Sequence, residues 1–330
     1  MSRHKLIPYK LKIRPKQRTR DYADLTNILT SDPFEEKYRG QSSAPQTFLE
    51  IFDNYCQNWM SNAHEDQDNQ KTLGVSDYQD EYFVEFQDNL IEGVFKYGEY
   101  GQVADHYDTQ NNTRNNNARS AAEAAEMPIY FLLHVPPANP REGLLILEQS
   151  NNRGIKLLLQ DALSDALPKG ATHELKQVSD DDVFGTIRAA NKITRFSVEK
   201  TESPDALGGG FASSFSQSTN SNTMTYRPTN SGSLKLDVDK LEQWVSNNSD
   251  PFKNVNGDTY TEVKITIKSA GSETTIDLTS GNVKIDRTLD SVSKQGGHPI
   301  PSSLAIEARK FVNQELPPSG NTIPVQTQLR

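Results

Sequence analysis

The 330-residue sequence contains a single cysteine, Cys56, and no long apolar run. One cysteine excludes an internal disulfide, and it also excludes structural zinc sites of the Cys₄ or Cys₂His₂ kind. No segment approaches the roughly 18–20 consecutive apolar residues of a membrane-spanning helix, and the basic amino terminus lacks the apolar stretch of a secretory signal. We therefore expect a cytoplasmic protein.

Apolar residues are also scarce. The residues A, V, I, L, M, F, W, Y and C make up 34% of the chain. With glycine counted in place of tyrosine the share is about 36%, against roughly 45–50% in an ordinary globular domain. A chain of this length still buries a substantial core in one or two domains. We expect a lean core connected by long polar loops.

Positive charge is scarce outside the amino terminus. The chain carries a net charge of −9, yet its first 20 residues hold eight Lys and Arg and no acid, which leaves −17 on the remainder. Such a remainder repels phosphate, so any contact with nucleic acid is confined to a local basic face. Within 7–14, apolar residues alternate with Lys10, Lys12 and Arg14, which predicts a half-buried strand with one basic face. A solvated edge strand, protected by its lysines from aggregation, explains the same pattern.

Apolar periodicity predicts several further elements in the first two thirds of the chain. Cys56 lies on the apolar stripe of a predicted helix, where we expect an inert core thiol. The Asn-rich segment 105–119 has almost no apolar residue and is expected to protrude as a loop. The predicted elements are a helix over 46–60, a loop over 61–80, strands over 82–86, 90–97, 129–136 and 143–150, a helix over 155–167, a helix over 183–192 preceded by an N-cap at Ser179, and a strand over 194–200.

The last third begins with a segment rich in Gly, Ser, Thr and Asn, which we interpret as a flexible joint. A short helix starting at Asp237 or Asp239 follows, and strands over 261–268, 274–278 and 282–286 form a meander before a helix from Ser302 or Ser303 to about 316. The predicted fold is α+β. It has a lobe of mixed or antiparallel sheet with packed helices over 1–202, the joint over 203–232, a smaller lobe of β-meander and helix over 233–318, and a tail over 319–330.

Motifs that carry chemistry are largely missing. The sequence has no G-x-S-x-G, Walker loop or G-x-G-x-x-G motif, so nucleotide hydrolysis is not expected. His106 stands between Asp105 and Asp108, where a divalent cation could bind, although a polar loop commonly carries such residues for solubility. We expect no cofactor.

One pattern fits a metal-dependent nuclease. Asp250 or Asp258 precedes Glu262 and Lys264, and residues two apart on a strand share a face, so these side chains could address one Mg²⁺ and one water. A Glu-x-Lys pair on the solvent side of a hairpin gives the same pattern without any chemistry. The nuclease is therefore an alternative, with Asp258, Glu262 and Lys264 as its catalytic residues.

Positive side chains on regular elements form a second candidate for phosphate contact. Arg188 and Lys192 are four residues apart and would share a helix face, with Arg195 and Lys200 just beyond. Such side chains neutralise phosphates without reading bases, which gives sequence-tolerant and salt-dependent binding. Solvated surface charge explains them equally well.

Several segments resemble RexA-type phage-exclusion proteins and, in the same general way, the DNA-binding subunit of Kiwa-type defence systems. These segments are the two strands and helix of 129–167, VFGTIRAANKITRFSVEK over 183–200, and above all the meander over 262–285 with the helix that follows. The likeness covers roughly half of the chain and includes no catalytic motif. It implies a cytoplasmic, dimeric DNA-binding sensor of bacterial antiphage defence, which works with a separate membrane protein.

The leading interpretation is therefore non-enzymatic, sequence-tolerant binding of double-stranded DNA in phage defence. Its expected partners are a second copy of the chain and a membrane or other defence-system subunit. The alternatives are the Mg²⁺-dependent nuclease and a scaffold that binds proteins without nucleic acid. The residues predicted to contact DNA are Lys10, Lys12, Arg14, Arg188, Lys192, Arg195 and Lys200.

Overall fold

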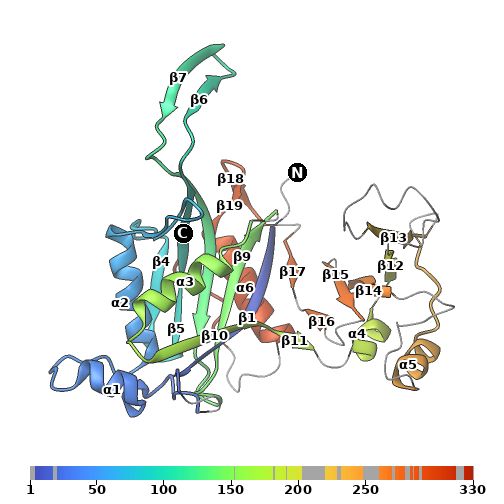
Figure 1. The fold of residues 1–330 in the computed structure, drawn as a ribbon, viewed down its shortest axis with the longest axis horizontal. Coiled ribbons are helices and arrows are strands. Elements are labelled where there is room, and N and C mark those ends of the chain that lie inside the picture. Colours follow the sequence, from blue (N-terminus) through green and yellow to red (C-terminus); the bar gives the residue numbers. More distant parts are fainter. Residues whose placement is uncertain are drawn as a thin grey trace, which may run out of the picture. The chain divides into compact units, whose positions relative to one another are not determined.

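A computed structural model gives the fold as two compact units (Figure 1). The first unit comprises Met1–Gln177 and Ser291–Arg330, and the second comprises Val178–Asp290. The residues that the structure describes are 4–17, 21–151, 153–180, 183–190, 192–202, 220–228, 232–247, 260–269, 272–278, 283–284, 286–289, 292–316 and 323–329.

An antiparallel sheet organises the first unit. Its strands follow the order β10-β1-β9-β8-β5-β3-β2, and β4 pairs with β5 beside β3 (Figure 1). The apolar runs of β8 and β9 place them in the middle of the sheet, buried on both faces. The strands are β1 (His4–Pro15), β2 (His64–Asp66), β3 (Lys71–Val75), β4 (Tyr82–Glu85), β5 (Leu90–Glu99), β8 (Ala125–His134), β9 (Gly143–Ser150) and β10 (Ala171–Gln177).

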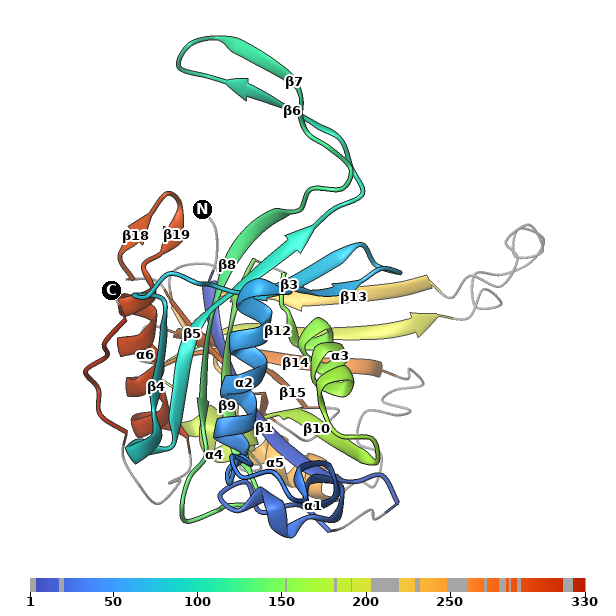
Figure 2. The same cartoon turned by 90° about the vertical axis from the view of Figure 1, so that its left-hand side faces the viewer.

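Helices cover both faces of this sheet. Figure 2 shows α2 (Phe48–Ser61) and α3 (Lys156–Ala166) on one face and α6 (Pro301–Glu315) on the other. Phe52 of α2 lies against Phe131 of β8 with ring centroids 6.1 Å apart, at the centre of the main apolar core. The remaining short elements are α1 (Asp32–Tyr38), the 3₁₀ helices η1 (Ile28–Thr30) and η2 (Phe86–Asp88), and a small hairpin of β18 (Lys294–Gln295) and β19 (His298–Pro299).

Helix α2 begins as its sequence predicts. The Thr47 hydroxyl accepts a hydrogen bond from the Glu50 backbone N–H at 3.2 Å, and the Glu50 carboxylate accepts one from the Thr47 backbone N–H at 3.3 Å, which is a capping box. Cys56 lies on the inner side of the helix and is fully buried. Burial raises the pKa of its thiol, so the prediction of an inert core thiol is confirmed.

A saturated charge network lies on the face covered by α6. Arg309 and Glu92 are both fully buried, and the guanidinium donates two hydrogen bonds to the carboxylate at 2.8 and 3.2 Å. The same carboxylate accepts hydrogen bonds from the Tyr130 hydroxyl, at 3.0 Å, and from the Thr327 hydroxyl. Arg309 also donates to the carbonyl of Pro324 at 2.8 Å. These bonds connect strand β5, helix α6 and the segment 323–329.

A two-stranded arm extends beyond the sheet of the first unit (Figures 1 and 2). It consists of β6 (Ala104–Asp108) and β7 (Thr113–Arg119), which pair only with each other. The prediction of a protruding segment over 105–119 is confirmed, but the segment forms a hairpin instead of a loop. Its backbone satisfies its own hydrogen bonds, so an apolar core is not required to shape it.

The second unit is built on a sheet of order β13-β12-β14-β15. Ile193, Val263, Ile265, Ile267 and Ile276 form its buried core with residues of the neighbouring helices. Two further strands, β11 and β16, pair with each other. The elements are β11 (Ser179–Asp180), α4 (Val183–Ala189), β12 (Lys192–Glu202), β13 (Asn220–Tyr226), α5 (Val238–Asn247), β14 (Tyr260–Ser269), β15 (Ser272–Asp277), β16 (Val283–Lys284) and β17 (Arg287–Thr288).

The α+β class is confirmed, and so are the main helices and strands of the first 177 residues. Two local predictions there are wrong. Strand β1 is not an edge strand, because it pairs with β9 on one side and β10 on the other. The segment 61–80 is not a loop, because it contains the paired strands β2 and β3.

Larger differences concern the order of elements after residue 178. Ser179 belongs to strand β11 instead of capping a helix, and helix α4 ends at Ala189, so Lys192 is the first residue of a strand. The expected third strand of the meander pairs with β11, and β12 supplies the neighbour of β14. The two compact units also differ from the predicted lobes, because β12 belongs to the second unit and α6 to the first.

Most of the predicted joint over 203–232 lies outside the described residues, as does part of the tail over 319–330. In the ranges that are described, none of the helices combines the length and apolar character needed to cross a lipid bilayer.

Candidate nucleic-acid interface

A polar cleft of about 380 Å³ lies at the base of the arm. Four separate segments line it: the turn into β3, the end of β5 with the chain that leads to the arm, the end of β7 with the start of β8, and the turn after β9. Strand pairing brings them together, because Lys71 of β3 is opposite Glu99 of β5, which is in turn opposite Ala125 of β8. The cleft therefore belongs entirely to the first unit.

Three cations line this cleft: Lys71, Arg119 and Arg153. Arg119 is the last residue of β7 and donates to the backbone carbonyl of Glu99 at 3.4 Å, while its buried Nε has no hydrogen-bond partner. Arg153 is exposed and follows a tight turn in which its backbone N–H donates to the Ser150 carbonyl at 2.9 Å. None of the three forms an ion pair with any described residue. In a chain with a net charge of −9, three cations without an ion pair around one cleft give a local positive potential.

Two acids beside these cations, Glu99 and Asp66, accept hydrogen bonds from neutral groups. The carboxylate of Glu99 accepts a hydrogen bond from the Tyr97 hydroxyl at 2.5 Å. Burial of the Tyr97 hydroxyl is the largest cause that raises its pKa to about 12, and the hydrogen bond to Glu99 is the second. Asp66 accepts hydrogen bonds from the backbone N–H and the side-chain amide of Asn69, at 3.1 and 2.8 Å, and these bonds lower its pKa. Glu99 keeps its negative charge and lines the same cleft, so the lining carries three cations and one carboxylate, a net positive charge that an anion can approach.

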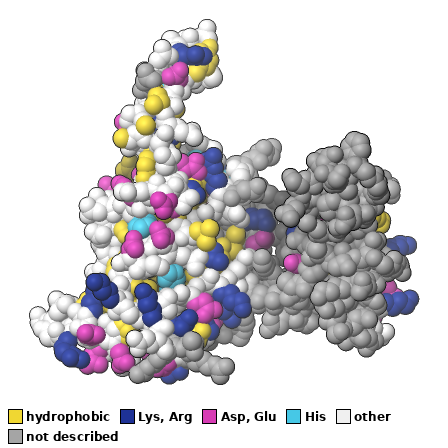
Figure 3. Space-filling model, in the orientation of Figure 1, with side chains coloured by type: hydrophobic (Ala, Val, Ile, Leu, Met, Phe, Trp, Pro, Cys, Tyr) yellow, Lys and Arg dark blue, Asp and Glu magenta, His cyan; other side chains and the backbone are white. Residues whose placement is uncertain are grey.

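The arm above the cleft is exposed from Asp105 to Asn116. In Figure 3 most of its surface is uncharged, with few acidic or basic side chains. The carboxylate of Asp108 accepts from the backbone N–H groups of Gln110 and Asn111, at 2.8 and 3.1 Å, and thereby closes the turn at the tip. These bonds and one from the Asn111 side chain lower the pKa of Asp108. The sequence offers His106 only as a possible cation contact, and no group of three or more potential metal ligands occurs in the described ranges.

The predicted basic face of the first strand exists, but its lysines are occupied. Lys10 and Lys12 share the carboxylate of Glu142 at 3.4 and 3.0 Å. Lys12 also lies over the ring of Tyr22 at 5.0 Å from its centroid, and its pKa is raised, with the hydrogen bond to Glu142 as the largest cause. Arg14 lies two residues further along the same face, opposite Thr172. An approaching phosphate would have to compete with Glu142 for both lysines.

Arg188 of the second unit is likewise engaged. Its guanidinium donates two hydrogen bonds to Asp239 of helix α5, at 3.0 and 2.8 Å, and it also pairs with Glu242. Its role in the structure is thus to connect α4 with α5. The predicted helix face shared with Lys192 does not form, because α4 ends before Lys192.

The other predicted phosphate contacts lie on β12. Arg195 is exposed at a bulge opposite Thr266 and forms no ion pair with a described residue. Lys200 follows further along the strand, opposite Tyr260, and its side chain lies outside the described part. Lys264 occupies the next strand, in register between Ser197 of β12 and Asp277 of β15.

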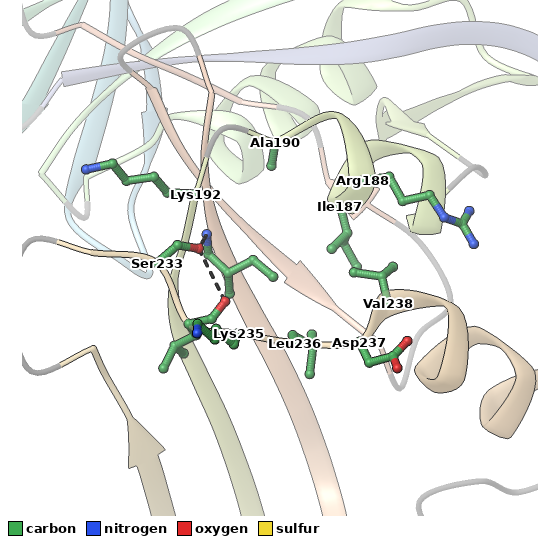
Figure 4. A pocket seen from close by; sticks show the side chains of 11 residues that line it. Ile187, Arg188, Ala190, Lys192, Ser233, Lys235, Leu236, Asp237 and Val238 are labelled. Carbon is green, nitrogen blue, oxygen red and sulfur yellow. Dashed lines mark hydrogen bonds between the residues drawn. The ribbon is translucent and has the colours of Figure 1, made fainter.

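An open groove of about 550 Å³ also occurs in the second unit (Figure 4). The inner residues Ile187, Leu236 and Val238 give it an apolar floor. Lys192 and Arg188 extend from it in opposite directions, so they do not converge on a common ligand (Figure 4). Ser233 hydrogen-bonds the backbone N–H of Ile193 at 2.9 Å, which ties the segment at the rim to β12.

Of the predicted nuclease residues, Asp258 and its alternative Asp250 lie outside the described residues. Glu262 and Lys264 both belong to β14, as predicted, with Glu262 opposite Glu199 of β12. Val263 and Ile265 point into the apolar core, which accounts for the alternation of this strand.

The sequence did not indicate the cleft, because Lys71, Arg119 and Arg153 come from three segments that have no common motif. The signal that was present is the Asn-rich segment 105–119, whose last residue is Arg119. No protein-family model matches this sequence, and no curated protein is similar enough to be matched to it.

Proposed function

We propose that the protein binds double-stranded DNA through the β6–β7 arm and the cleft at its base. The observation that carries this proposal is the set of three cations, Lys71, Arg119 and Arg153, that no described carboxylate pairs with. Guanidinium and ammonium groups are the usual protein contacts to phosphate oxygens, and Arg binds them in a bidentate manner. Their position at the foot of an exposed ribbon suits a duplex that lies against the body and along the arm.

The shape of the arm favours B-form DNA over double-stranded RNA. The major groove of B-DNA is about 12 Å wide and admits a two-stranded β-ribbon. The major groove of A-form RNA is deep and narrow, so a ribbon cannot enter it. The acidity of the chain confines the contact to this region, which makes the association local and salt-dependent.

In the setting implied by the resemblance to phage-exclusion proteins, such a complex would serve DNA sensing in antiphage defence without a catalytic step. A homodimer would present two arms to one duplex, and a membrane or other defence subunit would receive the signal. The second copy of the chain and the membrane or other defence subunit are part of what we propose.

The test replaces the three cations with glutamine in the full chain and measures binding of a labelled DNA duplex over a salt series. Each phosphate contact contributes about 0.9 to the slope of log K against log salt, so Lys71→Gln/Arg119→Gln/Arg153→Gln should reduce that slope by about 3. We expect roughly 100-fold weaker binding at low salt. Arg153→Gln alone, at an exposed site, tests the same proposal without a risk to folding.

The matched control is Lys10→Gln/Lys12→Gln/Arg14→Gln, which removes the same number of positive charges from the first strand. We expect little change in affinity from it. Equal losses in the two triple variants, or an unchanged affinity in the cleft variant, would remove the cleft from the DNA interface.

A further inference from the structure

The side chains of the arm divide into two faces of different chemistry. Register pairs Tyr107 with Arg114 and Asp108 with Thr113 across the ribbon. Side chains alternate along a strand, and directly opposite residues project to the same side. One face therefore carries Tyr107 and Arg114, with Asn116 two residues after Arg114, and the other carries His106, Asp108, Thr113 and Asn115. Asp105 falls at the register shift between Ala104 and His106.

Two polar side chains of the first face make no contact with other described polar groups in the folded protein. Arg114 and Asn116 are exposed, and neither has a hydrogen-bond or ion-pair partner among the described residues. The Tyr107 hydroxyl donates to the side-chain oxygen of Asn112 at the tip, which fixes the ring beside Arg114. On the second face the carboxylate of Asp108 is used by the turn. The second face otherwise offers His106, Thr113 and Asn115 and no Lys or Arg, so the exposed guanidinium of the ribbon, Arg114, lies on the first face.

We propose that this face reads base edges in the major groove, with Arg114 contacting a guanine and Asn116 an adenine. Arg donates two hydrogen bonds to the O6 and N7 of guanine, and Asn pairs in the same way with the N6 and N7 of adenine. The inference rests on the proposed DNA binding and adds a sequence preference to it. The cations of the cleft supply affinity through phosphates, while the exposed donors of the arm supply selectivity.

The experiment selects bound duplexes from a random DNA pool with the full-length protein and sequences them. The wild type should enrich a short motif that contains a guanine and an adenine. Arg114→Gln should lose the guanine preference and Asn116→Ala the adenine preference, each by roughly 5–150-fold against the other bases. Asn115→Ala, the neighbour on the opposite face, should retain the complete motif.

The outcomes separate the two proposals. Salt-sensitive binding of all sequences without any enriched motif, or a motif that survives both Arg114→Gln and Asn116→Ala, would overturn base reading and leave DNA binding intact. Failure of the wild type to bind any duplex would overturn the proposed function itself. Arg153→Gln should weaken the binding of all sequences and leave the motif unchanged.

Discussion

The guanidinium groups of Arg309 and Arg153 belong to the same folded unit, and their surroundings are opposite. Arg309 is fully buried, and its nitrogens donate to both oxygens of Glu92 and to the Pro324 carbonyl. Arg153 is exposed, and its side chain meets no acceptor among the described residues. The charge of Arg309 is compensated inside the fold, whereas the charge of Arg153 remains available to a ligand.

The comparison extends to the other cations of the molecule. Lys10 and Lys12 are held by Glu142, and Arg188 is held by Asp239 and Glu242. Lys71 and Arg119 are partly buried and likewise form no ion pair with a described residue, although Arg119 donates to the Glu99 carbonyl. Positive charge in a sequence therefore indicates a binding surface only where the fold leaves the cation without a carboxylate partner.

The largest effect is expected at the buried network. Glu92→Gln leaves the buried Arg309 charge with only the more distant carboxylate of Glu85, at 3.8 Å, and it also weakens the acceptor of Tyr130 and Thr327. Removal of one partner from such a pair costs about 3–5 kcal/mol of unfolding free energy. Urea denaturation followed by circular dichroism measures it.

The control for this variant is the double substitution Glu92→Leu/Arg309→Met, which removes both charges. Because a buried pair can be replaced by apolar residues at little cost, the double variant should be much more stable than Glu92→Gln. Equal stability of wild type and Glu92→Gln would show that the network does not support the fold.

The second effect concerns the cleft. Ala125→Glu places a carboxylate at its edge, opposite Glu99 and within the lining that contains Arg119 and Arg153. An acid there pairs with the cations and repels phosphate, so we expect roughly 10-fold weaker DNA binding at low salt. The matched variant Ala125→Gln has the same size and no charge, and it should bind as the wild type does. Equal affinities of the two variants would contradict the model of a free cationic cleft.

Local patterns were sufficient to predict most elements of the first unit. The helix over 46–60 and the strands over 129–136 and 143–150 were recognisable because their apolar residues recur with the period of the element. The pairing partners of the strands were not recognisable from local patterns, because register depends on contacts between distant segments. Thus β1 was expected at an edge, and the neighbour of β14 was expected from 282–286 instead of β12.

The candidate site shows the same limit more strongly. Composition marked 105–119 as protruding, but whether a cation is free depends on carboxylates far away in the sequence. Glu142 is more than a hundred residues from Lys12, and Asp239 is 51 residues from Arg188. The sequence consequently identified cations that the fold neutralises and missed Lys71 and Arg153.

A smaller effect on stability is expected at His134, a buried side chain that is hydrogen-bonded at one ring nitrogen only. Its Nδ1 donates to the Asn89 carbonyl at 3.2 Å, while its Nε2 is buried without a partner. Burial lowers the pKa of His134 below its ordinary value of 6.5. As the pH falls below 6.5, the unfolded chain takes up a proton before the folded chain does, so stability is lost in that direction. Denaturation between pH 7 and 5 should show a steeper loss for wild type than for His134→Gln, and parallel curves would contradict this assignment.

The smallest effect is expected from Glu142→Gln, although this variant releases both lysines of the first strand. Across the sheet, Lys10 is opposite Leu144 of β9, Leu144 is opposite His134 of β8, and His134 is opposite Leu90 of β5. Leu90 is the first residue of β5, whereas Glu99, beside the cleft, is the last. The released charges therefore lie a full strand length from the arm, beyond the roughly 8 Å over which physiological salt transmits their influence.

We expect the DNA affinity of Glu142→Gln at physiological salt to stay within about twofold of the wild type, because the released cations are screened from the arm. The measurement is the same duplex titration that is used for the cleft variants. A clear gain in affinity, with a steeper salt dependence, would instead place DNA on the first strand, where the sequence alone had located it. The availability of a cation, and not its distance from the arm, would then determine where this protein holds a polyanion.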